Sequence, residues 1–311
     1  FHAATVAQVR ALAKCPSARL LRELVVSYAE GERPNNRKNP YVHVTYKPGP
    51  DVPPRTDPHD APSLHALLHF PHLEGVRRFQ LGDGTPVMDG QPEEIGPPGT
   101  SGRLAHELAR RMPNLEELFL IARDVDTAAL FALPLPRLRV LTVYHNAHHP
   151  LDVLAANPTL TNLEVLLCRP RAMNTADEAN GAYIRLEHLR ALCRSPHLAK
   201  LKHLRLRLTD FGDAGVDEIV SSGLLKRLKI LDLEGGSVTD VGARTLAACP
   251  DFKNLDFLNL NTNALTPTGC AVLTATGMRV SVEGQHNLEP AQFMDGGVSA
   301  GPEYLFDGEY E

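Results

Sequence analysis

The chain has 311 residues, of which 43% are hydrophobic, and its 37 acidic and 32 basic residues give a formal net charge of −5. This acidic balance argues against a general nucleic-acid surface or an anionic-membrane surface, because both call for a basic excess. No apolar run reaches the ~18 residues of a membrane helix. The five cysteines are odd in number and include no CxxC pair, which favours a reducing cytoplasm over a disulfide framework.

One short pattern, LxxLxL, recurs along almost the whole chain, after a helical run at residues 6–15. Its nine copies start at Leu21, Val76, Leu115, Leu138, Leu163, Leu201, Leu228, Leu255 and Gly277. Each copy predicts a strand, because alternate apolar residues place their side chains on one face of a sheet. The stretches between copies carry apolar residues at helical spacing, so strands and helices are expected to alternate.

The three copies after residue 200 repeat at a fixed step of 27 residues. Leu204 recurs as Leu231 and Leu258, and the glycines downstream of them keep the same step. A repeat this regular indicates a solenoid, in which each unit buries its core against its neighbours. Asp213 and Asp240 stand where the N-caps of two of the predicted helices are expected.

At two copies the pattern extends to LxxLxLxxN and ends on Asn146 and Asn263. An asparagine there can satisfy backbone groups where the chain turns off the strand. With these motifs, residues 5–288 resemble the leucine-rich repeat family, and the 27-residue step is most similar to its ribonuclease-inhibitor-like branch, found also in many bacterial proteins. The resemblance implies an α/β solenoid shaped as a horseshoe, with a parallel β-sheet on the concave face and helices on the convex face.

Residues 1–288 are therefore expected to form a single solenoid of about nine repeats. Three gaps between predicted strands are too long for one repeat, and the excess lies near residues 29–60, 83–100 and 170–183. Each of these inserts directly follows a predicted strand, so all three should emerge on one rim of the horseshoe. Inserts on one edge of a solenoid often bind partners, but variable surface loops are the simpler interpretation.

The last part of the chain, residues 289–311, is Gly-rich and acidic and has no repeat pattern. It is expected to be a disordered tail or a cap that covers the exposed core of the last repeat. A third possibility is a short motif for a partner around Tyr304, Leu305 and Phe306.

The sequence contains no phosphate-binding loop, GxGxxG, HExxH or GxSxG motif. Histidines gather at two places that could in principle hold a metal, a helical pair and a loop cluster: His65 and His69; His145, His148 and His149. The pair has no third ligand fixed by the sequence, and a solvated loop is the simpler interpretation of the cluster. Asp124 and Asp126 are typical of a turn and a helix start. We therefore predict no catalytic residue, no metal site and no cofactor.

Residues between the repeat leucines should point into the hollow of the horseshoe. Six of them form an apolar patch that is expected to face solvent: Phe119, Ile121, Val140, Tyr144, Val165 and Leu167. Charged residues follow on the next strands: Arg169, Arg205, Arg207, Asp232 and Glu234. An exposed apolar patch edged by charges predicts a binding site for another protein. Two alternatives stay open, since the charges could pair across adjacent strands and a rim insert could cover the patch.

These patterns predict a non-enzymatic scaffold that binds a partner protein through the concave face and the rim with the inserts. A regulatory subunit that inhibits or activates an enzyme docked in the hollow is an alternative. An enzyme whose chemistry lies in a flanking domain is a third.

Overall fold

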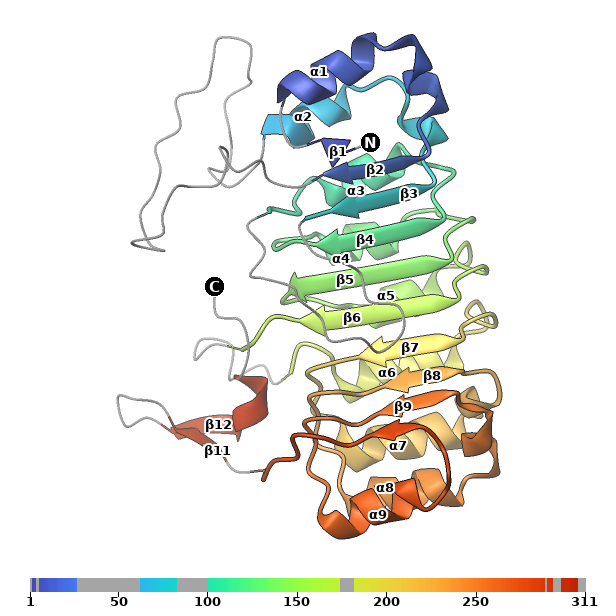
Figure 1. The fold of residues 1–311 in the computed structure, drawn as a ribbon, viewed down its shortest axis with the longest axis vertical. Coiled ribbons are helices and arrows are strands. Elements are labelled where there is room, and N and C mark those ends of the chain that lie inside the picture. Colours follow the sequence, from blue (N-terminus) through green and yellow to red (C-terminus); the bar gives the residue numbers. More distant parts are fainter. Residues whose placement is uncertain are drawn as a thin grey trace.

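The computed structural model describes residues 2–3, 6–26, 62–82, 100–173, 182–288, 290–292 and 298–306. Its main feature is one parallel sheet of ten strands that lie in the order of the sequence (Figure 1). The strands are β1 (His2–Ala3), β2 (Glu23–Val26), β3 (Arg78–Leu81), β4 (Glu117–Ile121), β5 (Val140–Asn146), β6 (Val165–Pro170), β7 (His203–Leu206), β8 (Ile230–Asp232), β9 (Phe257–Asn259) and β10 (Val280–Ser281). All nine predicted strands are present, and β1 adds one that the repeat pattern did not indicate.

Helices fill the connections on one side of this sheet (Figure 1). They are α1 (Val6–Lys14), α2 (Pro62–Leu68), α3 (Ala105–Arg110), α4 (Thr127–Phe131), α5 (Leu151–Ala156), α6 (Leu186–Arg194), α7 (Gly212–Ser221), α8 (Asp240–Ala248) and α9 (Pro267–Thr274). The predicted alternation of strand and helix is thus confirmed. Among the residues with a described position, no helix combines the length and the apolarity that crossing a membrane requires.

The register of the sheet places equivalent repeat residues side by side. Leu204 pairs with Leu231, and Leu231 pairs with Leu258, as adjacent rungs. The same column continues in both directions to Leu24 on β2 and Val280 on β10. The chain is therefore an α/β leucine-rich repeat solenoid, with the sheet on its concave face and the helices on its convex face.

The core of the solenoid is one continuous hydrophobic cluster that runs from Val9 to Leu273. Repeat leucines such as Leu204, Leu231 and Leu258 are fully buried in it. Each strand contributes its apolar residues from one face, and the next repeat covers them. No repeat could bury these side chains alone, which is why the units stack.

The predicted N-cap role of Asp213 and Asp240 is wrong, because both residues lie inside their helices. Each carboxylate instead reaches into the following repeat. Asp213 Oδ1 accepts hydrogen bonds from the backbone N–H groups of Thr239 and Gly242, both at 2.9 Å. A Cβ on Gly242 would come within 2.6 Å of this oxygen, so the repeated glycine makes room for a bond between repeats.

Asn146 and Asn263 have the role that the LxxLxLxxN pattern predicts. The Asn263 amide donates to the carbonyls of Leu233 and Asn261, at 2.9 Å and 3.1 Å, and its oxygen accepts from the Val238 N–H at 3.0 Å. Asn146 likewise donates to the carbonyls of the preceding repeat and its own turn. These amides tie successive turns together at the carboxyl ends of the strands.

The described part of the C-terminal segment folds back toward the carboxyl ends of the strands (Figure 1). Strands β11 (Pro290–Gln292) and β12 (Val298–Pro302) form an antiparallel hairpin, followed by the 3₁₀ turn η6 (Glu303–Leu305). Tyr304, Leu305 and Phe306 are buried against Met173 and Ala182, in the connection after β6. The described part of the tail thus contacts the rim of the solenoid after β6.

The structure describes only a small part of the predicted inserts. Residues 27–61, 83–99 and 174–181, which hold most of them, lie outside the described residues. The flanking described residues belong to connections that follow β2, β3 and β6, as the sequence indicates.

Candidate functional site

The concave face carries the columns of residues that the repeat pattern places there. Phe119 pairs with Gln80 on one side and with Thr142 on the other, and the column continues through Leu167 and Arg205. Since these residues alternate with the buried leucines, their side chains lie on the face opposite the helices. The predicted sidedness is therefore correct.

The predicted exposure of the apolar patch is wrong. All six side chains are at most 8% exposed, and Tyr144 and Ile121 are fully buried. They form two clusters apart from the main core, which are Phe119 with Val140 and Val165, and Ile121 with Tyr144 and Leu167.

Contacts between adjacent strands contribute to this burial. Neighbouring strands lie about 4.8 Å apart, so large side chains in one column touch each other directly. The Arg78 guanidinium also lies over the Phe119 ring, at 4.8 Å from its centre. The patch is therefore not a free surface, and most of the rim inserts that were expected to cover it as an alternative lie outside the described residues.

The charged residues of the next strands pair with each other. The Arg207 guanidinium donates two hydrogen bonds to Asp232 Oδ2, at 2.8 Å and 3.2 Å, and lies 3.4 Å from Glu234 Oε2. Asn259 donates to the same Glu234 oxygen at 3.0 Å, which extends the network onto β9. The alternative of pairing across strands is thus confirmed for Arg207, Asp232 and Glu234, and Arg205 beside them is buried.

Only two of the eleven predicted binding residues keep accessible surface, namely Arg169 and Glu234. Arg169 follows the end of the apolar column, near His145, and its charge helps to lower the pKa of that imidazole. The two predicted residues that stay accessible therefore lie at the carboxyl ends of their strands.

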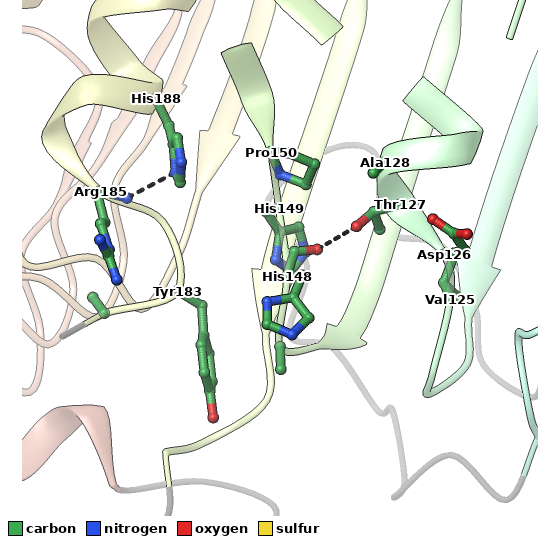
Figure 2. Close-up of a pocket in the computed structure, with 12 residues that line it drawn as sticks. Val125, Asp126, Thr127, Ala128, His148, His149, Pro150, Tyr183, Arg185 and His188 are labelled. Carbon is green, nitrogen blue, oxygen red and sulfur yellow. Dashed lines mark hydrogen bonds between the residues drawn. The ribbon is translucent and has the colours of Figure 1, made fainter. Parts of the chain in front are cut away.

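A pocket of about 720 Å³ opens at this rim, beyond the ends of β4, β5 and β6 (Figure 2). Its lining comes from three successive connections: Val125, Asp126, Thr127, Ala128, Ala147, His148, His149, Pro150, Ala182, Tyr183, Arg185 and His188. Figure 2 shows Tyr183, Arg185 and His188 on one side of the pocket and His148, Thr127 and Asp126 on the other. We refer to these twelve residues as the rim pocket.

Hydrogen bonds fix the connections that form the rim pocket. Thr127 Oγ1 donates to the His148 carbonyl at 2.6 Å, and the Asn146 amide donates to the same oxygen at 2.8 Å. Asp126 caps α4 by accepting from the Ala129 N–H at 2.9 Å, which agrees with its predicted place at a helix start. The pocket is thus preformed by the backbone of the solenoid.

The electrostatics of the rim pocket depend on which imidazoles stay neutral. Burial lowers the pKa of His149 to about 3, and the neighbouring His148 and His188 add to this effect. Burial and the Arg169 charge lower the pKa of His145 to about 4. Both rings are therefore neutral at pH 7, and the fixed positive charge of the pocket is Arg185, which is exposed.

The described residues include two buried thiols and no metal-binding cluster. Within the described ranges, no three His, Cys, Asp or Glu side chains come together in a way that could hold a metal ion. All five cysteines are free thiols, and burial raises the pKa of Cys168 strongly and that of Cys193 to about 11. These two buried thiols are protonated at neutral pH and do not act as nucleophiles.

Sequence reasoning missed most of the rim pocket. Tyr183, Arg185 and His188 belong to a connection that the repeat pattern does not cover. One signal was present, because the loop histidines after residue 144 and the insert at 170–183 both follow strands and so share a rim. Nothing in the sequence fixed how closely they approach.

No protein-family model matches this chain, and no curated protein matches it. Among solved structures, a protein from Bacteroides fragilis is similar over 90% of this chain and 70% of its own, with 18% sequence identity and a TM-score of 0.58. An internalin from Listeria monocytogenes matches 70% of this chain with 16% identity and a TM-score of 0.41. The matched part spans about half of that internalin, 50% of its length. At such identities the likeness to the Bacteroides protein concerns the fold alone.

Proposed function

We propose that this chain is a non-enzymatic scaffold that binds another protein at the rim formed by the carboxyl ends of its strands. The observation that carries the proposal is the rim pocket, which is open, preformed and lined by residues of three repeats. The concave face beside it is already filled by its own side chains. A partner would therefore meet the rim first.

The residue types of the rim pocket support recognition of a protein surface. Tyr and Arg contribute most strongly to the binding energy of protein interfaces, and Tyr183 and Arg185 project from one connection at this rim. Val125, Ala147 and Pro150 supply apolar wall between the polar groups. A pocket that combines an apolar wall with a few fixed polar groups suits an inserted side chain.

Arg169 and Glu234 are proposed as the part of the predicted concave-face site that a partner reaches. Both are partly accessible, and both lie at the carboxyl end of their strands. Their opposite charges would orient the partner and raise its encounter rate more than its affinity. The six apolar residues would then support the fold beneath the interface.

Three further features of this proposal come from the sequence. The 27-residue step supports the ribonuclease-inhibitor-like type of repeat and a bacterial source. The free thiols support a cytoplasmic location, where disulfides are rare. The acidic balance supports a protein partner over nucleic acid or an anionic membrane.

The test is partner capture by the full chain and by Arg185→Glu and Tyr183→Ala variants. Cross-linking with mass spectrometry in lysate of the native host should identify a partner whose recovery falls at least tenfold with either variant. Lys253→Glu is the matched control, since this exposed cation lies away from the rim pocket. Recovery that does not change with either rim variant would place the interface elsewhere, and the absence of any specific partner would refute the scaffold.

A further inference from the structure

The C-terminal segment Tyr304–Phe306 sits on the rim in the manner of a bound peptide. Its three side chains are only 2–3% exposed, although they follow a hairpin that is separate from the main sheet. They pack against Met173, Ala182 and Tyr183, in a cluster that is distinct from the core of the solenoid. The segment is thus held by a small contact of its own, which is easier to open than the repeats.

The polar contacts of the segment reinforce this description. Tyr304 Oη donates to the Thr209 carbonyl at 2.6 Å, and the Met173 N–H donates to the Leu305 carbonyl at 2.8 Å. The Tyr304 ring stacks on His286, with centroids 4.6 Å apart. His286 in turn lies 3.1 Å from the Gly236 carbonyl, so the stacking partner is itself fixed. A backbone hydrogen bond combined with buried side chains is a common way to recognise a short extended peptide.

The surface that receives the segment is formed by Met173, Ala182 and Tyr183; we refer to it as the groove, and it adjoins the rim pocket. Ala182 and Tyr183 belong to both, since they line the pocket and also contact the cluster. The groove is filled by an aromatic, an aliphatic and an aromatic residue, whereas the pocket is open and carries the Arg185 charge. A peptide that extended from the groove into the pocket could therefore add a carboxylate near Arg185.

We propose that this groove is a peptide-recognition site, and that Tyr304–Phe306 occupies it until a partner displaces them. The partner would carry an aromatic–aliphatic–aromatic segment with an acidic residue next to it, which is the chemistry of this chain's own Tyr-Leu-Phe-Asp. The inference rests on the proposed scaffold function and specifies what that scaffold binds. The self-contact would lower the apparent affinity of every partner that competes for the groove.

The experiment uses a fluorescein-labelled synthetic peptide with the sequence of residues 300–311 and measures its anisotropy on adding the full-length protein. A Leu305→Ala/Phe306→Ala variant should bind this peptide at least tenfold more tightly than the unaltered chain, because its own groove is vacant. A peptide with Ala in place of Tyr304 should bind at least tenfold more weakly. Adding Ala182→Asp to the vacant-groove variant should abolish binding.

Two controls keep the result decisive. If the vacant-groove variant keeps its melting temperature and binds the peptide no better than a scrambled sequence, the segment is a fixed part of the fold and the proposal fails. If that variant does not fold, hydrogen exchange of the unaltered chain decides. The Met173 amide should then exchange at least a hundredfold faster than the Leu204 amide, and equal protection would refute the proposal. Loss of peptide binding with unchanged Arg185-dependent capture would overturn only this inference and leave the scaffold intact.

Discussion

The two halves of the concave face share one backbone ladder but are filled in opposite ways. On β4, β5 and β6 the concave columns hold Phe119, Tyr144 and Leu167, which belong to two buried apolar clusters. In the next repeats the same columns hold Arg207, directly after β7, Asp232 on β8 and Asn259 on β9, which belong to a hydrogen-bonded network. The register is continuous across the boundary, since Leu167 pairs with Arg205.

This contrast separates two properties that the repeat pattern does not distinguish. Register decides on which face a side chain lies, and it does so equally in both halves. The neighbouring side chains decide whether it meets solvent. In the apolar half, large apolar side chains pack against one another. In the polar half, opposite charges pair across strands.

The largest effect is expected from the apolar half. Phe119→Ala should lower the free energy of unfolding by about 3–5 kcal/mol, because it removes a buried ring and leaves a cavity. Urea unfolding followed by circular dichroism measures this. Val241→Ala, at a side chain that is 53% exposed, is the control and should change the stability by less than about 0.5 kcal/mol. If Phe119→Ala lowers the free energy of unfolding by less than about 1 kcal/mol, as a surface substitution would, the side chain is exposed to solvent and not buried.

The polar half should lose stability when one partner of its buried ion pair is removed. Asp232→Ala should lower the free energy of unfolding by about 3 kcal/mol, because it leaves the buried Arg207 charge without its closest carboxylate. The double variant Arg207→Met/Asp232→Leu should recover most of this loss, since it removes both charges together. The same urea series measures both. A double variant as unstable as Asp232→Ala would show that the loss comes from packing and not from the unpaired charge.

The comparison also shows how far the sequence predicts this fold. The leucine column, the strand order and the Asn263 turn follow from spacing alone, because they depend on residues close in the sequence or on the 27-residue step. The capping prediction for Asp213 failed because its carboxylate bonds to the next repeat, and the sequence could not show that Gly242 leaves room for it.

The site was less predictable than the fold. The buried Phe119 ring contacts Arg78, 41 positions earlier, and packs with Val140 and Val165 of the next strands. The rim pocket depends on how three connections of unequal length approach one another, which no repeat pattern encodes. Of the predicted binding residues, only Arg169 and Glu234, at the carboxyl ends of their strands, stay as candidates.

At the rim beside the apolar half, buried histidines should make the protein sensitive to acid. The pKa of His149 is about 3 in the folded state and about 6.5 in the unfolded state. Below pH 6.5 the unfolded chain therefore binds a proton at this residue, whereas the folded chain leaves the imidazole neutral. Stability should fall as the pH drops, by about 2 kcal/mol at pH 5 from this residue. His149→Gln should flatten this part of the profile in urea unfolding, with His148→Gln, an exposed neighbour, as the control. Parallel profiles for the unaltered chain and His149→Gln would contradict the buried neutral ring.

The smallest effect concerns the turn that leaves the strand in each half. His145, Leu208, Gly235 and Thr262 stand at the same repeat position, and all have positive φ, with 52° at Thr262. A β-branched residue is strained there, whereas glycine is not, so Thr262→Gly should raise the free energy of unfolding by about 0.5–1 kcal/mol. Gly235→Ala, at φ 67°, is the mirror control and should lower it by a similar amount. The flexibility of glycine in the unfolded chain opposes this gain. A decrease in the free energy of unfolding for Thr262→Gly would mean that this entropy outweighs the backbone strain. The conformation of the turn would then be determined by the hydrogen bonds of the sheet and not by the residue at this position.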